Sequence, residues 1–282
     1  MQILIKILIF IALFLVLFSL FTFFMSIHPP KIITNIEPSD LGLEYEGITF
    51  KSADGIKLSG WLIPNNKTKK TVIVMHGYPA DKANLLGIAE FLTKDFNVFL
   101  FDFRSFGKSE GSYTTAGYLE KNDIIGAINY LEKEKNLTKI GLYGFSLGGA
   151  VALMVNHENV KAIVTDSAYA KLSNIVKHMY RIFFILKYPL AYLTKLYGIL
   201  FLRINIDDAS PVESIKNLEI PILLIHAEKD SQIPVKEAYL LSDANKNAEL
   251  WIVENAEHGM THSVDAGKYE KRIIKFFEQS IK

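Results

Sequence analysis

Gly144-Phe145-Ser146-Leu147-Gly148 is the most informative segment of this chain for predicting its fold. It follows a short apolar run, 139–143, and precedes small and apolar residues at helical spacing, 149–154. This order predicts a strand, a sharp turn and a helix, the context in which a G-x-S-x-G sequence presents a serine nucleophile at the edge of a sheet. Glycines two residues before and after the serine are required because a Cβ there would collide with neighbouring backbone. The sequence therefore predicts Ser146 as a catalytic nucleophile.

A serine hydroxyl attacks at neutral pH only when a base takes its proton and a carboxylate orients that base. Asp230 lies in the loop after a predicted strand, 220–225, and His258 lies in the loop after the next one, 249–253. Parallel strands place both loops at the carboxyl edge that also carries the serine. The order Ser146, Asp230, His258 predicts a triad.

Strands and helices alternate along most of the chain. An initial pair of strands is joined at Asp54-Gly55, a turn signal for an antiparallel hairpin. The predicted strands are 47–52, 58–63, 71–75, 97–101, 139–143, 161–165, 220–225 and 249–253, and the predicted helices are 83–94, 118–135, 147–156 and 265–280. This pattern predicts an α/β protein with a mostly parallel eight-stranded sheet and helices on both faces.

Composition bounds the possible functions. A chain of 282 residues is long enough for one large domain with a full core. The 31 Lys and Arg nearly balance the 30 Asp and Glu, so nucleic acid is not an expected partner. There is no cysteine, which excludes disulfides and thiolate zinc sites. The histidines show no metal-ligand spacing and no glycine-rich phosphate loop is present, so neither a metal nor a cofactor is expected.

The N-terminal segment is apolar from Ile7 to Ile27 except at Ser19, Thr22 and Ser26. That length is close to the roughly 20 residues that cross a bilayer. A cleaved secretory signal is the competing interpretation, but its apolar region is shorter and ends in small residues. We therefore predict an uncleaved single-pass membrane anchor over residues 1–31, followed by a catalytic domain over 32–282. A short, slightly positive N-terminus favours an extracytoplasmic catalytic domain.

The alternation of strands and helices is interrupted between Tyr169 and Asp208. Apolar residues recur there at helical spacing with lysines and arginines between them, and Pro189 is expected to divide the segment into two helices. The segment carries too many charges for a second membrane span. Its place late in the sheet predicts a helical cap over the site, at about 169–208, which we call the cap. Ordinary amphipathic packing is the alternative. As a cap, its apolar and cationic mixture would suit a site facing lipid or an acyl chain.

Further motifs surround these residues in a fixed order. They are His76-Gly77-Tyr78-Pro79, then Asp102-Phe103-Arg104-Ser105-Phe106-Gly107-Lys108-Ser109-Glu110-Gly111, and then Ser210-Pro211-Val212 before Pro221-Ile222-Leu223-Leu224-Ile225-His226. With these motifs and the serine, aspartate and histidine, the chain from about Ile48 to the C-terminus resembles the α/β-hydrolase superfamily. It is most similar to small bacterial serine hydrolases that often carry an N-terminal anchor, including serine aminopeptidase-like and dienelactone-hydrolase-like members.

The resemblance implies a role for each matching residue. Ser146 would be the nucleophile, His258 the general base and then acid, and Asp230 the orienting carboxylate. The backbone N–H groups of Tyr78 and Leu147 would form the oxyanion hole.

Residues around the implied triad have supporting roles or remain alternatives. His76 would brace its own loop, and Asp102, Arg104 and Ser109 would hold the loop beneath the site. Asp166 remains an alternative acid and His262 an alternative base. His258 is preferred because Ala-x-His-Gly is the family's usual context.

The expected activity is hydrolysis of an ester, in the manner of a carboxylesterase or lipase, through an acyl-enzyme on Ser146. The expected partners are a small-molecule ester or acyl substrate and a lipid bilayer. A peptidase or an acyltransferase on the same fold is one alternative, because substrate choice depends on the cap and pocket loops. A non-catalytic binding protein on a hydrolase scaffold is an alternative of another class.

Overall fold

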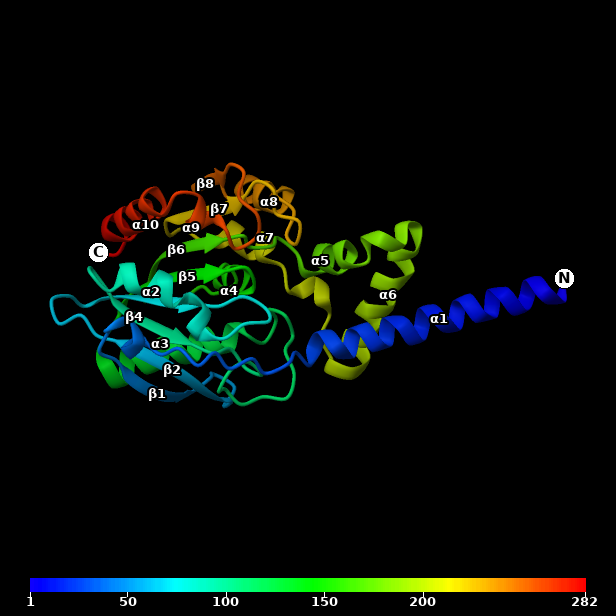
Figure 1. The fold of residues 1–282 in the computed structure, drawn as a ribbon, viewed down its shortest axis with the longest axis horizontal. Coiled ribbons are helices and arrows are strands. Elements are labelled where there is room, and N and C mark those ends of the chain that lie inside the picture. Colours follow the sequence, from blue (N-terminus) through cyan, green and yellow to red (C-terminus); the bar gives the residue numbers. More distant parts are fainter.

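An eight-stranded sheet organises the structure, a computed structural model that describes residues 1–282 (Figure 1). The strand order is β1-β2-β4-β3-β5-β6-β7-β8. β2 pairs antiparallel with both β1 and β4, and every other neighbouring pair is parallel. The strands are β1 Glu46–Lys51, β2 Lys57–Ile63, β3 Lys70–Met75, β4 Asn97–Phe101, β5 Lys139–Phe145, β6 Val160–Asp166, β7 Ile222–Ala227 and β8 Ala248–Val253. The predicted hairpin and mostly parallel sheet are confirmed.

Helices cover both faces of the sheet. On one face α3 (Lys121–Lys135), α4 (Leu147–Ala152) and α8 (Lys236–Ala244) form the larger core. On the other face α2 (Leu86–Leu92) and α10 (Ala266–Ser280) form a second core. Successive side chains of β3 pack into different cores. Ile73 packs in the larger core, and Val72 and Val74 pack in the second core. Buried on both sides, β3 is a continuous apolar run rather than an alternating one.

Short elements complete the body. They are η1 Pro38–Leu41, η2 Lys82–Leu85, η5 Ile206–Asp208, α7 Pro211–Ser214, η6 Ile215–Asn217 and α9 Thr261–Val264. The strand predicted at 220–225 begins and ends two residues later as β7, because Pro221 has no N–H to contribute to the ladder. His226 therefore belongs to the strand, and not to the loop after it.

The insertion after β6 contains α5 (Leu172–Met179), η3 (Arg181–Leu186), α6 (Lys187–Tyr197) and the π-helical turn η4 (Gly198–Leu202). The expectation that Pro189 divides the segment is wrong. Pro189 lies in the first turn of α6. A backbone N–H there has no acceptor within the helix, so a proline, which has no N–H, is tolerated. The break occurs at Phe184, whose φ of 48° lies outside the helical region.

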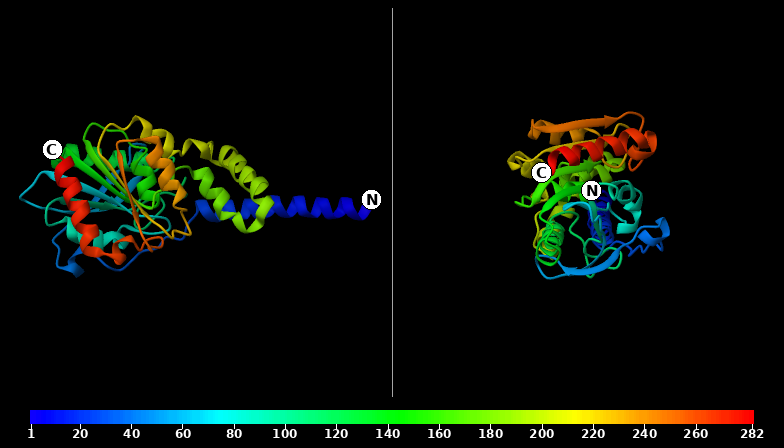
Figure 2. Two further views of the ribbon diagram at one scale, coloured as in Figure 1. Left: turned by 90° about the horizontal axis from the view of Figure 1, so that it is seen from above. Right: turned by 90° about the vertical axis from the view of Figure 1, so that its left-hand side faces the viewer.

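The N-terminal apolar run forms one helix, α1 (Gln2–Ile27). Its N-terminal half projects away from the body, and its C-terminal half passes beside the cap helices (Figures 1 and 2). By length and composition, α1 and the segment Arg181–Leu202 could each cross a membrane. The second segment is not one straight helix, however, because it is broken at Phe184 and consists of η3, α6 and η4.

Candidate active site

The turn between β5 and α4 is strained at one residue. Ser146 has φ 51° and ψ −112°, which a non-glycine residue adopts only when its surroundings enforce it. A Cβ on Gly144 would lie 2.4 Å from the backbone of Gly148, and a Cβ on Gly148 would lie 2.4 Å from a carbonyl oxygen of β3. The Ser146 N–H donates to the Asp166 carbonyl at 2.8 Å, which ties the turn to β6. Tight packing of backbone against backbone thus holds the serine in the predicted turn.

Asp230 and His258 meet although 28 residues separate them. The Nδ1 atom of His258 lies 2.6 Å from Oδ2 of Asp230. The other carboxylate oxygen, Oδ1, accepts the backbone N–H groups of Gln232 at 2.9 Å and Ile233 at 2.7 Å. These contacts fix the carboxylate, and with Nδ1 as the donor they leave Nε2 of the histidine as the free acceptor.

The electrostatics of this pair favour an ionised carboxylate. Burial acts to raise the pKa of Asp230, but the hydrogen bonds from His258 and from the Ile233 amide outweigh burial and lower it. Asp230 therefore keeps its negative charge at neutral pH, as the orienting partner of a histidine that becomes cationic during catalysis must.

The two alternative residues have other partners. Asp166 is buried and accepts hydrogen bonds from Thr261, from Ser167 at 3.0 Å and from Tyr269 at 2.7 Å. It lines a cavity of about 310 Å³. His262 pairs with Glu270, with Nε2 to Oε1 at 3.0 Å. Neither alternative contacts the Asp230–His258 pair through a hydrogen bond.

The histidine loop lies against the serine turn. The rings of His258 and Phe145, the residue before Ser146, are 5.0 Å apart at their centroids. A Cβ on Gly259 would also contact the Phe145 ring, at 3.4 Å. No hydrogen bond joins the Ser146 hydroxyl to His258, whose side-chain bond goes to Asp230. The structure brings the three residues to one edge of the sheet and pairs two of them.

The predicted oxyanion-hole amides are both unpaired. Neither the N–H of Tyr78 nor that of Leu147 donates a hydrogen bond within the chain. The Tyr78 loop lies against Ser146, since a Cβ on Gly77 would lie 3.2 Å from the Cβ of Ser146. Leu147 is the first residue of α4, where backbone N–H groups have no intrahelical acceptor. Two free donors therefore flank the serine.

His76 braces the loop that carries Tyr78. Its Nδ1 donates to the Gly77 carbonyl at 2.7 Å, and its Nε2 accepts the Phe103 N–H at 3.0 Å, a pattern that requires the neutral ring. Complete burial lowers the pKa of His76 and keeps the ring neutral. The structural role predicted for His76 is confirmed.

The segment that begins at Asp102 is held by charged groups. Asp102 accepts the Lys108 N–H at 2.9 Å, and its own carbonyl accepts the Ser109 hydroxyl at 2.6 Å. Arg104 pairs with Asp54 and Asp123, each at 2.6 Å. The predicted supporting roles of Asp102, Arg104 and Ser109 are confirmed.

Sequence reasoning missed Lys82. Only 3% of its side chain is exposed, and its ammonium lies 2.6 Å from Asp102 and 4.5 Å from the centroid of the Trp61 ring. A lysine in the polar stretch after Pro79 is ordinarily expected to be solvated, so no local signal distinguishes it. The ion pair links η2, next to the Tyr78 loop, to the end of β4.

Comparison with known proteins identifies the family. Residues 70–181 match the family model of the alpha/beta hydrolase fold. The chain is 31% identical over 245 residues to YfhR of Escherichia coli strain K12, covering 82% of this chain and 80% of that protein. The chain belongs to the α/β-hydrolase superfamily. Its described residues contain no cluster of three or more His, Cys, Asp or Glu side chains able to hold a metal ion.

A solved α/β-hydrolase structure bears on the class of activity. The esterase Pf2001 of Pyrococcus furiosus superimposes with a TM-score of 0.75 and 30% identity, covering 91% of this chain and 99% of that one. A more distant relative, the membrane protein YNL320W of Saccharomyces cerevisiae, is 27% identical over 150 residues, covering 51% of this chain and 52% of that protein. The family match and the esterase structure support hydrolase activity of the esterase kind.

Proposed function

We propose that this α/β-hydrolase is a membrane-anchored serine esterase that acts through an acyl-enzyme on Ser146. The observation that carries the proposal is the 2.6 Å pair of His258 and Asp230 at the sheet edge that also holds the strained serine. The likeness to an esterase at 30% identity favours an ester over a peptide substrate.

The proposed reaction has two steps, acylation of Ser146 and hydrolysis of the acyl-enzyme. His258 Nε2 takes the hydroxyl proton as Ser146 Oγ attacks the ester carbonyl, and the N–H groups of Tyr78 and Leu147 stabilise the oxyanion. The C–O bond to the alcohol then breaks, and His258 returns the proton to the leaving alcohol. Water next attacks the carbonyl carbon of the acyl-enzyme and loses its proton to His258. The bond between that carbon and Ser146 Oγ then breaks, His258 returns the proton to Oγ, and the acid leaves. Removing one oxyanion donor typically reduces the rate by about 10²–10³.

Labelling by a fluorophosphonate probe tests the nucleophile. Such a probe reacts with an activated serine, so the wild-type protein should be labelled and Ser146→Ala should not. Ser167→Ala is the matched control, because Ser167 also has a positive φ and lies just beyond the end of the neighbouring strand, β6. Persistent labelling of Ser146→Ala would refute the assignment, and an unreactive wild-type protein would favour a non-catalytic binding protein.

Substrate class is tested by direct comparison of leaving groups. The proposal expects hydrolysis of p-nitrophenyl esters of graded chain length and little release from aminoacyl nitroanilides. Preferential cleavage of the anilides would make the protein a peptidase on the same catalytic residues.

We further propose that α1 stays attached as the anchor, residues 1–31, of a hydrolase domain that spans 32–282 with the cap at about 169–208. Phe23 and Ile27 are buried against Tyr197 of the cap, so removal of α1 as a signal peptide would expose that surface. A yeast relative described as a membrane protein agrees with this role. Retention of the uncleaved N-terminus in carbonate-washed membranes is the expected result, and an N-terminus cut near Ile27 would contradict it.

A further inference from the structure

The polar residues within the apolar run of α1 connect it to the cap. Ser19, Thr22 and Ser26 are three and four residues apart and therefore share one side of the helix. The hydroxyls of Thr22 and Tyr180 are hydrogen bonded at 2.6 Å, and those of Ser19 and Tyr197 lie 3.2 Å apart. Ser19 is fully buried by this contact. Two of the three polar interruptions thus have partners on the cap.

Aromatic packing strengthens the same contact. The ring centroids of Phe18 and Phe183 are 5.2 Å apart, and those of Phe23 and Tyr197 are 5.7 Å apart. Hydroxyl pairs and rings together make the C-terminal half of α1 one packed unit with the cap. The cap must therefore lie at the same depth relative to a membrane as the C-terminal half of α1.

The N-terminal half of α1 is too short to cross a bilayer alone. Every residue from 1 to 14 is exposed, and the cap contacts begin beyond them. The helical residues 2–14 rise about 20 Å, whereas the hydrocarbon core is about 30 Å thick. Roughly seven more residues, up to about position 21, must also enter for α1 to span. Phe18 and Ser19, which touch the cap, lie within that stretch.

The surface of the cap near α1 is apolar, and no other part of the chain covers it. Five exposed side chains form it, and we call them the cap rim: Ile182, Phe184, Ile185, Tyr188 and Tyr192. Phe184 is 83% exposed, the highest value among them. Transfer of such apolar side chains from water into hydrocarbon is favourable.

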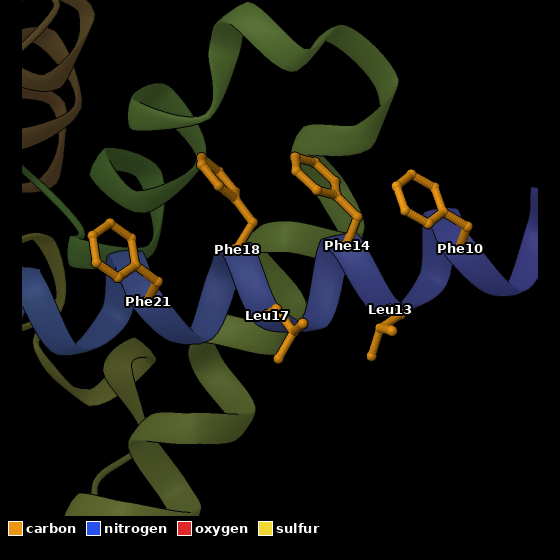
Figure 3. A pocket seen from close by; sticks show the side chains of 6 residues that line it. All are labelled: Phe10, Leu13, Phe14, Leu17, Phe18 and Phe21. Atoms are coloured by element: carbon orange, nitrogen blue, oxygen red, sulfur yellow. The ribbon is translucent and has the colours of Figure 1, made fainter.

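An apolar hollow on α1 continues this surface. It has a volume of about 350 Å³ and is lined only by α1 side chains: Phe10, Leu13, Phe14, Leu17, Phe18 and Phe21 (Figure 3). Because Phe18 also packs on Phe183 of η3, the hollow adjoins the cap. A hollow lined by apolar residues next to an apolar rim fits lipid acyl chains.

Residue types around the rim match a membrane interface. Arg181 is the first residue of η3 and Lys187 follows its last residue, and the Lys187 ammonium lies 5.2 Å from the Tyr188 ring centroid. Tyrosines gather at the headgroup level of membranes, and long cationic side chains can extend back to the headgroups.

We propose that the cap rim enters the same bilayer as α1 and is covered by phospholipid acyl chains. This inference rests on the proposed anchoring role of α1 and adds a second lipid-contacting element to it. The chain passes from β6 directly into the cap, so the carboxyl edge with Ser146 lies on the membrane side of the body (Figure 1). Esters dissolved in the lipid are then the substrates nearest to the site.

Single cysteines carrying the environment-sensitive fluorophore NBD test the proposal, because the full chain has no cysteine of its own. Ile182→Cys and Ile185→Cys report on the rim. Phe10→Cys on α1 is the lipid reference, and Gln279→Cys on α10, at the opposite end of the molecule from the N-terminus, is the water reference (Figure 1). Each full-length variant is reconstituted in phosphatidylcholine vesicles with and without doxyl-labelled phosphatidylcholine.

The expected result is emission at shorter wavelength from both rim positions than from position 279, with quenching by doxyl lipid as at position 10. Quenching at position 10 without quenching at the rim overturns the inference and leaves the anchor standing. Absence of quenching at position 10 as well overturns both. NBD emission from the rim could also be at shorter wavelength but unquenched by doxyl lipid, and return to longer wavelength when the protein is diluted in lipid. That result would show that a second copy of the chain covers the rim, and it also overturns the inference.

Discussion

Replacing Asp230 with asparagine should move a proton to the wrong atom of His258 while hardly changing the shape of the site. Two backbone N–H groups, of Gln232 and Ile233, donate to Oδ1 of Asp230. In the variant, the side-chain amide oxygen takes the place of Oδ1 and accepts from the same two N–H groups. The amide NH₂ must therefore face Nδ1 of His258. Nδ1 then has to accept a hydrogen bond, and the ring proton moves to Nε2. A histidine protonated at Nε2 cannot take the proton of Ser146.

The magnitude follows from that change of tautomer. The same substitution in a serine protease triad reduces kcat about 10⁴-fold, which corresponds to about 5.5 kcal/mol of barrier. We expect a loss of that size for Asp230→Asn with p-nitrophenyl esters, and nitrogen NMR should show His258 protonated at Nε2. Thermal unfolding should change little, because the variant retains both backbone hydrogen bonds.

Asp166→Asn is the matched control, since it makes the same substitution in the other candidate carboxylate. Asp166 bonds to Tyr269 and Ser167 and not to His258, so we expect kcat within about a factor of ten of wild type. A fully active Asp230→Asn enzyme would contradict the orienting role of Asp230, and a loss confined to Asp166→Asn would assign the acid role to Asp166.

Three further substitutions test how the site is supported. Lys82→Met leaves Asp102 buried without its ion-pair partner and should cost about 3–5 kcal/mol in urea unfolding; an unchanged midpoint would contradict that role. Hydrogen bonds from Arg104 lower the pKa of Asp54 to about 2, so its stabilisation is present above the ordinary pKa of 3.8 and lost as the pH falls through 2. Since 37% of that side chain is exposed, Asp54→Asn should cost only about 1 kcal/mol at pH 7 and progressively less as the pH falls from 3.8 through 2, as measured by unfolding across that range. Gly148→Ala should destabilise by about 1–3 kcal/mol, because its Cβ would lie 2.4 Å from a carbonyl oxygen of β3, and a neutral effect on Tm would show that the turn can relax.

The sheet and the serine turn were predictable because their signals are local. Buried parallel strands need unbroken apolar runs, and those runs are visible at β3 and β4. The glycines around Ser146 appear in the sequence because the turn has no room for a Cβ. The order of Ser146, Asp230 and His258 could be read for the same reason, since each follows a recognisable strand.

Contacts between distant segments could not be predicted this way. Nothing near Lys82 in the sequence indicates that it pairs with Asp102, and nothing near Ser19 or Thr22 indicates that these hydroxyls meet tyrosines more than 150 residues away. The prediction for Pro189 is wrong because a proline ends a helix in its interior but is tolerated in its first turn, and the sequence does not show where α6 begins.

Local patterns in the sequence were enough to predict the strands and the order of the residues proposed for catalysis, because backbone sterics and burial on both faces of a sheet restrict the residues allowed there. Which carboxylate meets His258, which lysine neutralises Asp102 and how α1 packs on the cap became visible in the folded chain alone. Those outcomes depend on which side chains the packed sheet and helices bring within hydrogen-bonding distance, and no local pattern records that distance.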